Sequence, residues 1–242
     1  MKVAVTGVGR WTPSPGADEP PCAIADGRAK RGTSRITRML GEVVEQAVRE
    51  AGADVASVAT VYASAWGEID IMVGLLAQIH DGDVGLSPLR FKHSVHNAAS
   101  GLVSIAASNR AFSTAIAAGE RTVEQGVVEA WALLAAGTPE VVLAAGDDRL
   151  PAPLDRFGAY EGFAGAVCLT RDPGTRRVRA WLERPRPLDS SASTDLPEPF
   201  ATNPSAWLAP LLDAIAAGQA REVVLSAAAR PLAVSVTPGP LR

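Results

Sequence analysis

The chain has 242 residues, of which 47% are hydrophobic and 20% charged, and its formal net charge is −3. This composition is typical of a globular protein that buries its own core, and it excludes a basic nucleic-acid face or a polybasic membrane anchor. No apolar run reaches the roughly 18 residues of a membrane span, and no charged and apolar leader precedes the first expected strand. Cys22 and Cys168 lack metal-binding spacing, so we expect a cytoplasmic protein with reduced thiols.

The N-terminal segment, KVAVTGVG at 2–9, alternates small and β-branched side chains and predicts a buried strand. Its glycines do not make a dinucleotide-binding loop, because threonine and prolines follow and no helix begins there. The proline- and glycine-rich stretch 11–32 predicts a covering loop. A helix is then expected over 35–51, with Thr33 or Ser34 as its N-cap and Gly52 closing it.

The remaining segments continue this alternation of strands and helices. The expected elements are a strand over 58–64, a helix over 67–79, a buried helix over 97–107, strand 112–118, helix 123–136 and strand 140–148. After them come strands 165–170 and 178–184 around a turn at 172–175, a loop over 186–204, helix 204–218 and final strands over 222–229 and 232–238. This order predicts helices layered around a mixed, mainly parallel sheet, in a single domain over 1–242.

Two of the three histidines lie in one short segment, FKHSVHNAASG at 91–101. On a helix His93 and His96 would share a face and could hold a divalent metal with a third ligand. No glutamate follows in the manner of a zinc-binding helix, and His80 belongs to an expected loop. We therefore interpret His96 as a structural residue at the hinge into the next helix, and we expect no metal and no cofactor.

No strong catalytic motif is present. The sequence has no glycine-flanked serine of the kind that a Ser-His-Asp hydrolase places on a strand-to-helix turn. Asp147 and Asp148 follow an expected strand, at the edge where α/β sheets bind ligands. Because adjacent side chains point in different directions, we interpret these two acids as solvated turn residues.

The segment from Ser87 to Glu120, followed by a helix and the strand VVLAAGDD, resembles the N-terminal half of β-ketoacyl-acyl-carrier-protein synthases. More closely, it is similar to the short chain-length-factor-type proteins of aryl polyene systems. The resemblance rests on the block SVHNAASG at 94–101, on the S-x-x-GE pattern from Ser64 to Glu68, and on Leu150-Pro151 after the acidic strand end. It covers residues 1–170 well and the helix and strands over 205–242 loosely. It implies a thiolase-like fold of which this chain holds the N-terminal half.

The resemblance also implies that the chain lacks condensing activity. Asn97 and Gly101 match the family's Asn-x-x-x-Gly helix, and the position of the nucleophilic cysteine is occupied by Glu120. A carboxylate cannot form the thioester that a thiolate forms, although it could mimic the carboxylate of a malonyl-type substrate. No histidine follows His96 to stabilise a thioester oxyanion.

A partner subunit follows from the same resemblance. The family's interface strand corresponds to Phe112, Ser113, Thr114, Ala115, Ile116 and Ala117. Arg90, Phe91 and Ser94 correspond to residues that reach the partner's acyl tunnel and limit chain growth sterically. The implied partners are a full-length ketosynthase and, through that complex, an acyl carrier protein; no nucleic acid is expected.

Two other functions remain open from the sequence. The chain could be a stand-alone acyl-thioester transferase or hydrolase that uses Glu120, His96 or Asp147. It could also be a scaffold that stabilises a ketosynthase without touching its acyl tunnel.

Overall fold

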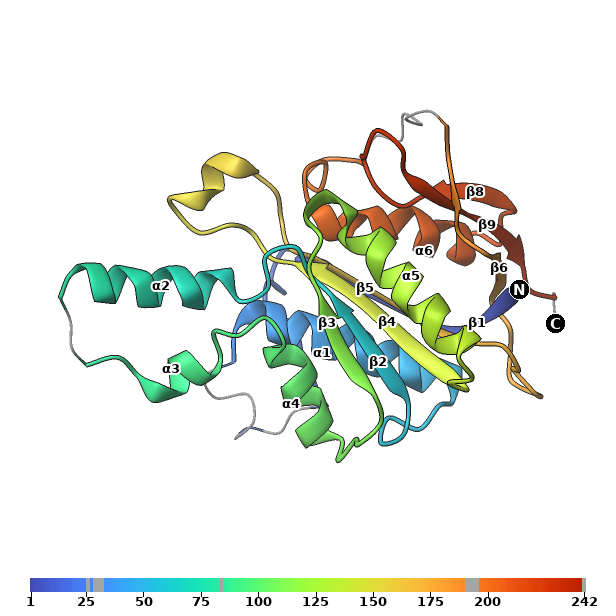
Figure 1. Ribbon diagram of the computed structural model, residues 1–242, viewed down its shortest axis with the longest axis horizontal. Coiled ribbons are helices and arrows are strands. Elements are labelled where there is room, and N and C mark those ends of the chain that lie inside the picture. Colours follow the sequence, from blue (N-terminus) through green and yellow to red (C-terminus); the bar gives the residue numbers. More distant parts are fainter. Residues whose placement is uncertain (25–26, 28–32, 83–84, 190–195, 241–242) are drawn as a thin grey trace.

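The computed structural model describes residues 1–24, 27, 33–82, 85–189 and 196–240. They form a nine-stranded sheet with helices on both faces (Figure 1). The strands are β1 (Lys2–Trp11), β2 (Ala59–Ala63), β3 (Ser113–Ile116), β4 (Glu140–Asp147), β5 (Phe163–Thr170), β6 (Ala180–Glu183), β7 (Arg186–Pro187), β8 (Arg221–Val224) and β9 (Leu232–Pro238). The α-helices are α1 (Arg35–Ala51), α2 (Ile69–His80), α3 (Pro88–Lys92), α4 (Ala98–Ala106), α5 (Thr122–Ala135) and α6 (Ala209–Ala216). Three 3-10 turns accompany them, η1 (Gly119–Arg121), η2 (Leu154–Phe157) and η3 (Pro204–Leu208).

The sheet runs in the order β3-β2-β4-β5-β1-β6-β9-β7, and β8 pairs with β9. β2 pairs in parallel with β3 and β4, whereas the other strand pairs of the described ranges are antiparallel. The sheet is therefore mixed, as predicted, but its parallel part is smaller than the mainly parallel sheet that the segment order suggested. The physical reason is that β5 lies antiparallel between β4 and β1. The helical connection through α1 therefore links β1 and β2, which run in the same direction but are not neighbours in the sheet.

The N-terminal strand β1 lies between the two strands that flank the turn at 172–175. Val5 pairs with Leu169 of β5 on one side and with Ala180 of β6 on the other. β5 and β6 are thus consecutive in sequence but are not neighbours in the sheet. The sheet of the C-terminal region is therefore joined to the rest through the first residues of the chain.

Helix α1 packs closely on β1 because two glycines allow it. A side chain at Gly9 would come within 2.2 Å of the carbonyl oxygen of Val43, and one at Gly7 within 2.1 Å of that of Ala47. The helix begins where predicted, since the Ser34 hydroxyl accepts a hydrogen bond from the Thr37 amide at 3.0 Å. The glycines that suggested a nucleotide loop are therefore packing residues.

Two apolar layers enclose the sheet. On one face α1 and part of α4 bury residues that include Met39, Val43 and Val103 against the strands. On the other face α5, η3 and α6 bury Leu134, Leu208 and Leu211. Figure 1 shows α2 and α3 outside both layers, where they project from one end of the sheet. None of the helices in the described ranges is long and apolar enough to cross a membrane.

Several predicted elements differ from the observed ones. The expected helix 204–218 begins as the 3-10 turn η3 and becomes α-helical only from Ala209. The expected loop 186–204 contains the short strand β7, which pairs with β9, and residues 190–195 lie outside the described ranges. The expected buried helix 97–107 is α4, of which only one side is buried, since Ile105 is 74% exposed. The short helix α3 was not predicted.

Candidate functional site

The carboxylate of Asp147, at the end of β4, is fully buried and accepts four hydrogen bonds. Oδ1 accepts from the Ser64 hydroxyl at 2.8 Å and the Trp66 amide at 3.0 Å. Oδ2 accepts from the Ala65 amide at 3.1 Å and the Ser205 hydroxyl at 2.5 Å. Burial raises the pKa of Asp147, and these hydrogen bonds act in the opposite direction. Asp147 therefore joins the end of β2 to the beginning of η3.

The interpretation of Asp147 as a solvated turn acid was wrong. β2 and β4 are parallel neighbours, so their carboxyl ends meet, and the turn after β2 places its donors beside Asp147. η3 then covers this edge, and the Asn203 side-chain amide donates to the Asp147 carbonyl at 3.0 Å. The sequence carried no signal of this cover, because Asn203 and Ser205 lie more than fifty residues away from Asp147 along the chain.

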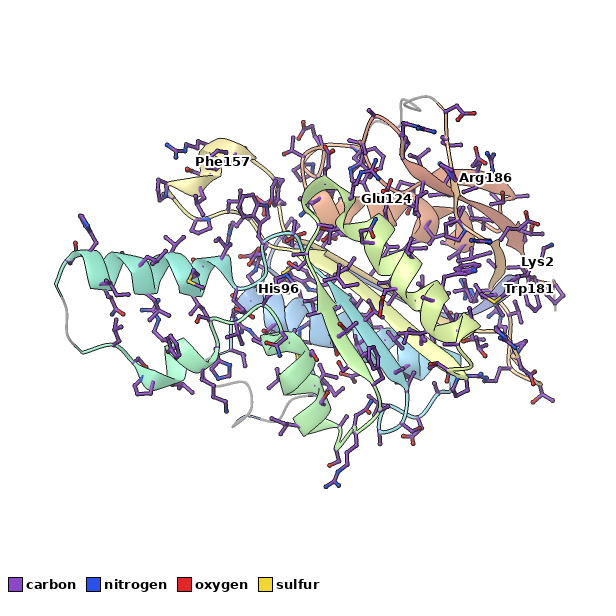
Figure 2. All side chains as sticks on the ribbon, viewed as in Figure 1. Lys2, His96, Glu124, Phe157, Trp181 and Arg186 are labelled. Carbon is purple, nitrogen blue, oxygen red and sulfur yellow. The ribbon has the colours of Figure 1, made fainter. Side chains whose placement is uncertain are left out.

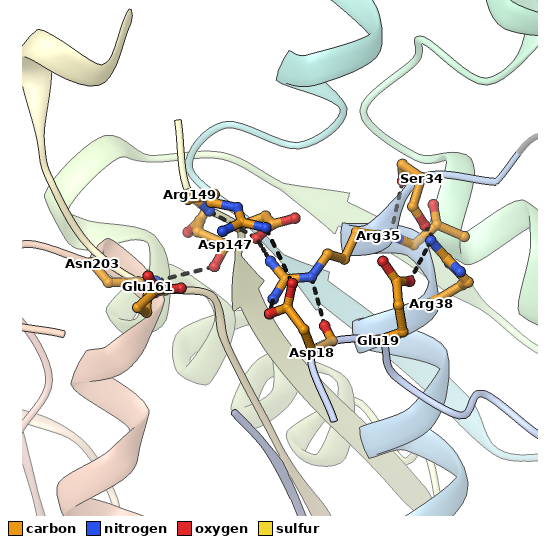
Figure 3. A network of polar contacts seen from close by, with 11 residues as sticks. Asp18, Glu19, Ser34, Arg35, Arg38, Asp147, Arg149, Glu161 and Asn203 are labelled. Atoms are coloured by element: carbon orange, nitrogen blue, oxygen red, sulfur yellow. Dashed lines mark hydrogen bonds and ion pairs between the residues drawn. The ribbon is translucent and has the colours of Figure 1, made fainter. Parts of the chain in front are cut away.

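Asp148, the second acid, lies in an ion-pair network shown in Figure 3. It pairs with Arg35, which also pairs with Asp18 at 2.7 Å. The Arg35 guanidinium lies 5.1 Å from the centre of the Trp11 ring. Burial raises the pKa of Asp148, and the charge of Arg35 acts against this. The network fixes the loop after β1 to the start of α1, and we assign it a structural role.

His96 belongs to the segment between α3 and α4 (Figure 2). Its Nε2 lies 2.8 Å from the carbonyl oxygen of Ser64, and because a carbonyl only accepts, Nε2 is the donor. The ring packs on Gly67, where a side chain would come within 2.6 Å of the imidazole. His93 lies at the end of α3, so the two histidines do not share a helix. Within the described ranges, no three His, Cys, Asp or Glu residues are grouped to hold a metal ion.

Ser64 is not arranged as a nucleophile. It is 3% exposed, and its hydroxyl donates to Asp147 while accepting from the Gly67 amide at 2.8 Å. His96 contacts its carbonyl and not its hydroxyl. A serine, a histidine and an aspartate thus lie together without the geometry of a catalytic triad.

Glu68 is a buried acid beside this turn. One carboxylate oxygen accepts a hydrogen bond from the Thr37 hydroxyl, and the other, Oε2, is buried without a partner in the described residues. Burial raises the pKa of Glu68, while hydrogen bonds from Ser34 and Thr37 oppose the shift. The S-x-x-GE pattern therefore places Ser64 and Glu68 in two neighbouring buried contacts.

Glu120 follows β3 and lies in η1, directly before α5. It is exposed and lines a cavity of about 410 Å³. The residues that line this cavity with it are Ala65, Trp66, Gly119, Ala201, Thr202, Pro204, Trp207 and Ala227. His96 and Asp147 are not among them, although Asp147 holds the backbone of Trp66.

Neither cysteine offers a reactive thiol. Cys22 and Cys168 are both fully buried, and they form no disulfide among the described residues. Burial and the neighbouring charge of Glu140 raise the pKa of Cys168, which disfavours the thiolate.

Exposed large hydrophobic side chains are concentrated in one part of the chain. Of the eleven in the described ranges, eight lie between residues 72 and 112 and three lie elsewhere. The eight, which we call the arm surface, are Met72, Leu76, Ile79, Leu89, Phe91, Val95, Ile105 and Phe112. The other three are Met1, Val128 and Phe157. Exposed apolar side chains mark an interaction site where they form one contiguous patch.

The residues expected near a partner's tunnel differ in exposure. Phe91 is 66% exposed on α3, whereas Ser94 is 7% exposed and its hydroxyl donates to the Phe91 carbonyl at 2.9 Å. The guanidinium of Arg90 lies over Gly74 of α2, where any side chain would collide with it. Of these three, Phe91 presents the largest exposed fraction.

The expected interface residues 112–117 include all of β3. This strand is at the end of the sheet order and pairs only with β2 among the described strands. Ser113, Thr114, Ala115 and Ile116 are half-buried, and Phe112 before them is 51% exposed. Asn97 and Gly101 lie at the start and in the middle of α4.

Comparison with known proteins first defines the class of this fold. A ketosynthase (ApeO) in complex with its chain length factor (ApeC) from Xenorhabdus doucetiae is similar, with a TM-score of 0.72 and 21% identity over 97% of this chain and 99% of the compared chain. The ishigamide ketosynthase/chain length factor gives a TM-score of 0.63 and 13% identity over 91% and 74%. A type II PKS acyl carrier protein in complex with its ketosynthase bound to the hexaketide gives a TM-score of 0.73 and 14% identity over 98% of this chain and 99% of the compared chain. The chain therefore has a thiolase-like ketosynthase fold, as predicted.

The sequence identifies the family itself. The family described as beta-ketoacyl synthase, N-terminal domain, matches residues 10–225. The chain belongs to this family. Among curated proteins, none matches the chain.

Proposed function

We propose that the chain is a catalytically silent subunit, similar to a chain length factor, that pairs with a full-length β-ketoacyl synthase and shapes its acyl tunnel in aryl polyene biosynthesis. The arm surface is the observation that carries the proposal. Eight large hydrophobic side chains lie exposed along α2, α3, the segment to α4, α4 and the start of β3. The free edge of β3 continues this surface. Such an edge and such a patch need a partner to remove them from water.

The proposed lack of condensing activity in this subunit rests on the side chain at position 120. A carboxylate cannot form and release an acyl thioester as a cysteine thiolate does. The two cysteines of the chain are buried elsewhere, and His96 is engaged with the Ser64 carbonyl. In this reading the ketosynthase supplies the chemistry and receives the acyl carrier protein.

The length control is assigned to Phe91. Its side chain is 66% exposed near the end of α3, and Leu89 and Val95 close to it in sequence are also exposed. A rigid aromatic ring at the end of a tunnel stops a growing chain, because overpacking by even a few methylene groups costs about 1–3 kcal/mol. Ser94 then helps to position Phe91, because its hydroxyl donates a hydrogen bond to the Phe91 carbonyl. Arg90 helps to position the same helix by packing on α2.

Co-expression with a full-length ketosynthase from the same organism tests the pairing. We expect a 1:1 complex by size-exclusion chromatography with light scattering. Ile105→Asp is expected to weaken it by about 2 kcal/mol or more, or roughly thirtyfold in Kd. Val128→Asp is the matched control, since Val128 is also a β-branched, exposed residue on a helix but lies outside the arm surface. A chain that stays a well-behaved monomer beside the ketosynthase contradicts the proposal.

A stand-alone enzyme is the second candidate, because Glu120 lines a cavity. The isolated chain should then hydrolyse or transfer acyl thioesters, and Glu120→Ala should abolish turnover. We expect no turnover by the isolated wild-type chain or by its Glu120→Ala variant. A scaffold without length control would leave the products unchanged when Phe91 is replaced in the complex.

A further inference from the structure

The cavity beside Glu120 is lined by one acidic residue and two tryptophans. Its walls come from four separate parts of the chain: the turn after β2, the start of η1, the region around η3, and the connection between β8 and β9. Among the described residues that line it, Glu120 alone is charged, and the others are Trp66, Trp207, a threonine and small or apolar residues. At about 410 Å³, it lies within the range of about 300–1,000 Å³ that holds small ligands.

The two tryptophans are held in place by one buried group. The Trp66 amide donates to Asp147 Oδ1 at 3.0 Å. Trp207 is 8% exposed and belongs to η3, which Ser205 fixes to Asp147 Oδ2 and Asn203 fixes to the Asp147 carbonyl. Both indole-bearing walls are therefore anchored to Asp147, so the cavity is formed before any ligand arrives.

The carboxylate of Glu120 has no cation beside it. Among the hydrogen bonds and ion pairs of the described residues, none involves its side chain. The adjacent Arg121 is turned away, since it pairs with the buried Glu124 at 3.3 Å and donates to the Arg230 carbonyl at 3.0 Å. Glu124 in turn accepts from Ser226 and from the Leu232 amide, which fixes this arrangement. The nearest arginine in sequence thus cannot neutralise Glu120 without breaking these contacts.

We propose that this cavity binds a small organic cation, an ammonium group carried on an apolar body. Indole faces attract ammonium groups through the negative potential of the ring, and quaternary ammonium ligands are the common case. A carboxylate at the same cavity adds a charge of the right sign and disfavours carboxylates and phosphates. A neutral ligand of equal shape would gain the apolar contacts alone. The proposal concerns the chain by itself and goes beyond its pairing with a ketosynthase.

Ligand titration of the full chain with an isosteric pair tests this proposal. The probes are choline and its neutral carbon isostere 3,3-dimethylbutan-1-ol, with 3,3-dimethylbutanoate as the anion, read by tryptophan fluorescence and by saturation-transfer NMR. We expect choline to bind about tenfold more tightly than the neutral isostere, and the anion not to bind. Glu120→Gln should weaken choline by about fivefold or more and leave the isostere unchanged.

Glu129→Gln is the matched control, because it removes the same charge from α5 at a position that does not line the cavity. Trp66→Leu should weaken choline as well, and an unchanged thermal unfolding curve shows that each variant is folded. Equal binding of choline and its isostere overturns the proposal. So does an equal effect of the Glu120 and Glu129 variants, which would indicate a general charge effect. Either outcome leaves the pairing with a ketosynthase untouched.

Discussion

The imidazole of His96 donates a hydrogen bond to the carbonyl oxygen of Ser64, at 2.8 Å and across thirty-two positions of the chain. This contact ties the segment before α4 to the turn after β2, the same turn that binds Asp147. It gives His96, in the SVHNAASG block, a structural role. It also places that block between the arm surface and the buried network.

His96→Ala is expected to lower the free energy of unfolding by about 1–3 kcal/mol, because it leaves the Ser64 carbonyl without its donor and opens a gap over Gly67. Chemical denaturation of the purified chain measures this change. His80→Ala, at the exposed end of α2, should stay within about 0.5 kcal/mol. Equal effects of the two substitutions would mean that the contact contributes nothing.

Glu68 predicts a pH dependence of stability. Burial raises its folded-state pKa, so the folded protein holds the proton more tightly than the unfolded chain does. The free energy of unfolding contributed by this group is therefore highest below about pH 4.3 and falls as the pH rises through the folded-state pKa. Glu68→Gln removes this pH-dependent loss. The free energy of unfolding of the variant, relative to that of the wild-type protein, should therefore increase as the pH rises.

Denaturation of both proteins from pH 4 to pH 8 measures the difference directly. Asp147 and Asp148 shift stability in the same direction, and subtracting the two curves removes their contribution. A Glu68→Gln protein that loses stability relative to the wild type as the pH rises would contradict the prediction.

Gly101→Ala should have opposite effects on the chain and on its complex. A side chain at Gly101 meets nothing within 4 Å, and alanine favours an α-helix over glycine by about 1 kcal/mol. The isolated chain should therefore keep or gain stability. Gly101 lies one turn before Ile105 on the same side of α4, so the added methyl group should weaken pairing with the ketosynthase. Calorimetric unfolding and a binding titration together separate the two effects.

Phe91→Ala in the ketosynthase complex should lengthen the acyl products, since it removes the exposed ring assigned to the end of the tunnel. Mass spectrometry of the products bound to the carrier protein measures their length. Leu89→Ala, on the same short helix and also exposed, is the control and should leave the length unchanged. Products that lengthen equally with both variants would assign the effect to the helix and not to the ring.

Much of the fold follows from local patterns that the sequence makes plain. α1 was predicted over 35–51 with Thr33 or Ser34 as its cap and Gly52 as its stop, because cap residues and an apolar stripe agree there, and the structure has Ser34 as the cap. The strand pairings were not predictable in the same way. Nothing local indicates that β1 lies between β5 and β6, since pairing is decided by contacts between distant segments.

The candidate site was predictable only in part. The resemblance to the ketosynthase family located Glu120 directly after β3, as the structure has it. The buried state of Asp147 could not be predicted, since its donors Ser64 and Ser205 are unremarkable in sequence and meet only after the sheet and η3 have formed. Acidic residues at the end of a strand indicate a solvent-exposed position. In this fold the tertiary packing buries that position instead.

Hydrogen–deuterium exchange of the chain, alone and with its ketosynthase, tests the partner role most directly. The arm surface and the free edge of β3 should be covered in the complex. We predict slower exchange of the amides over 98–106 and 113–116 in the complex, with α5 unchanged. Protection confined to α5, with the β3 edge exchanging as in the free chain, would contradict it.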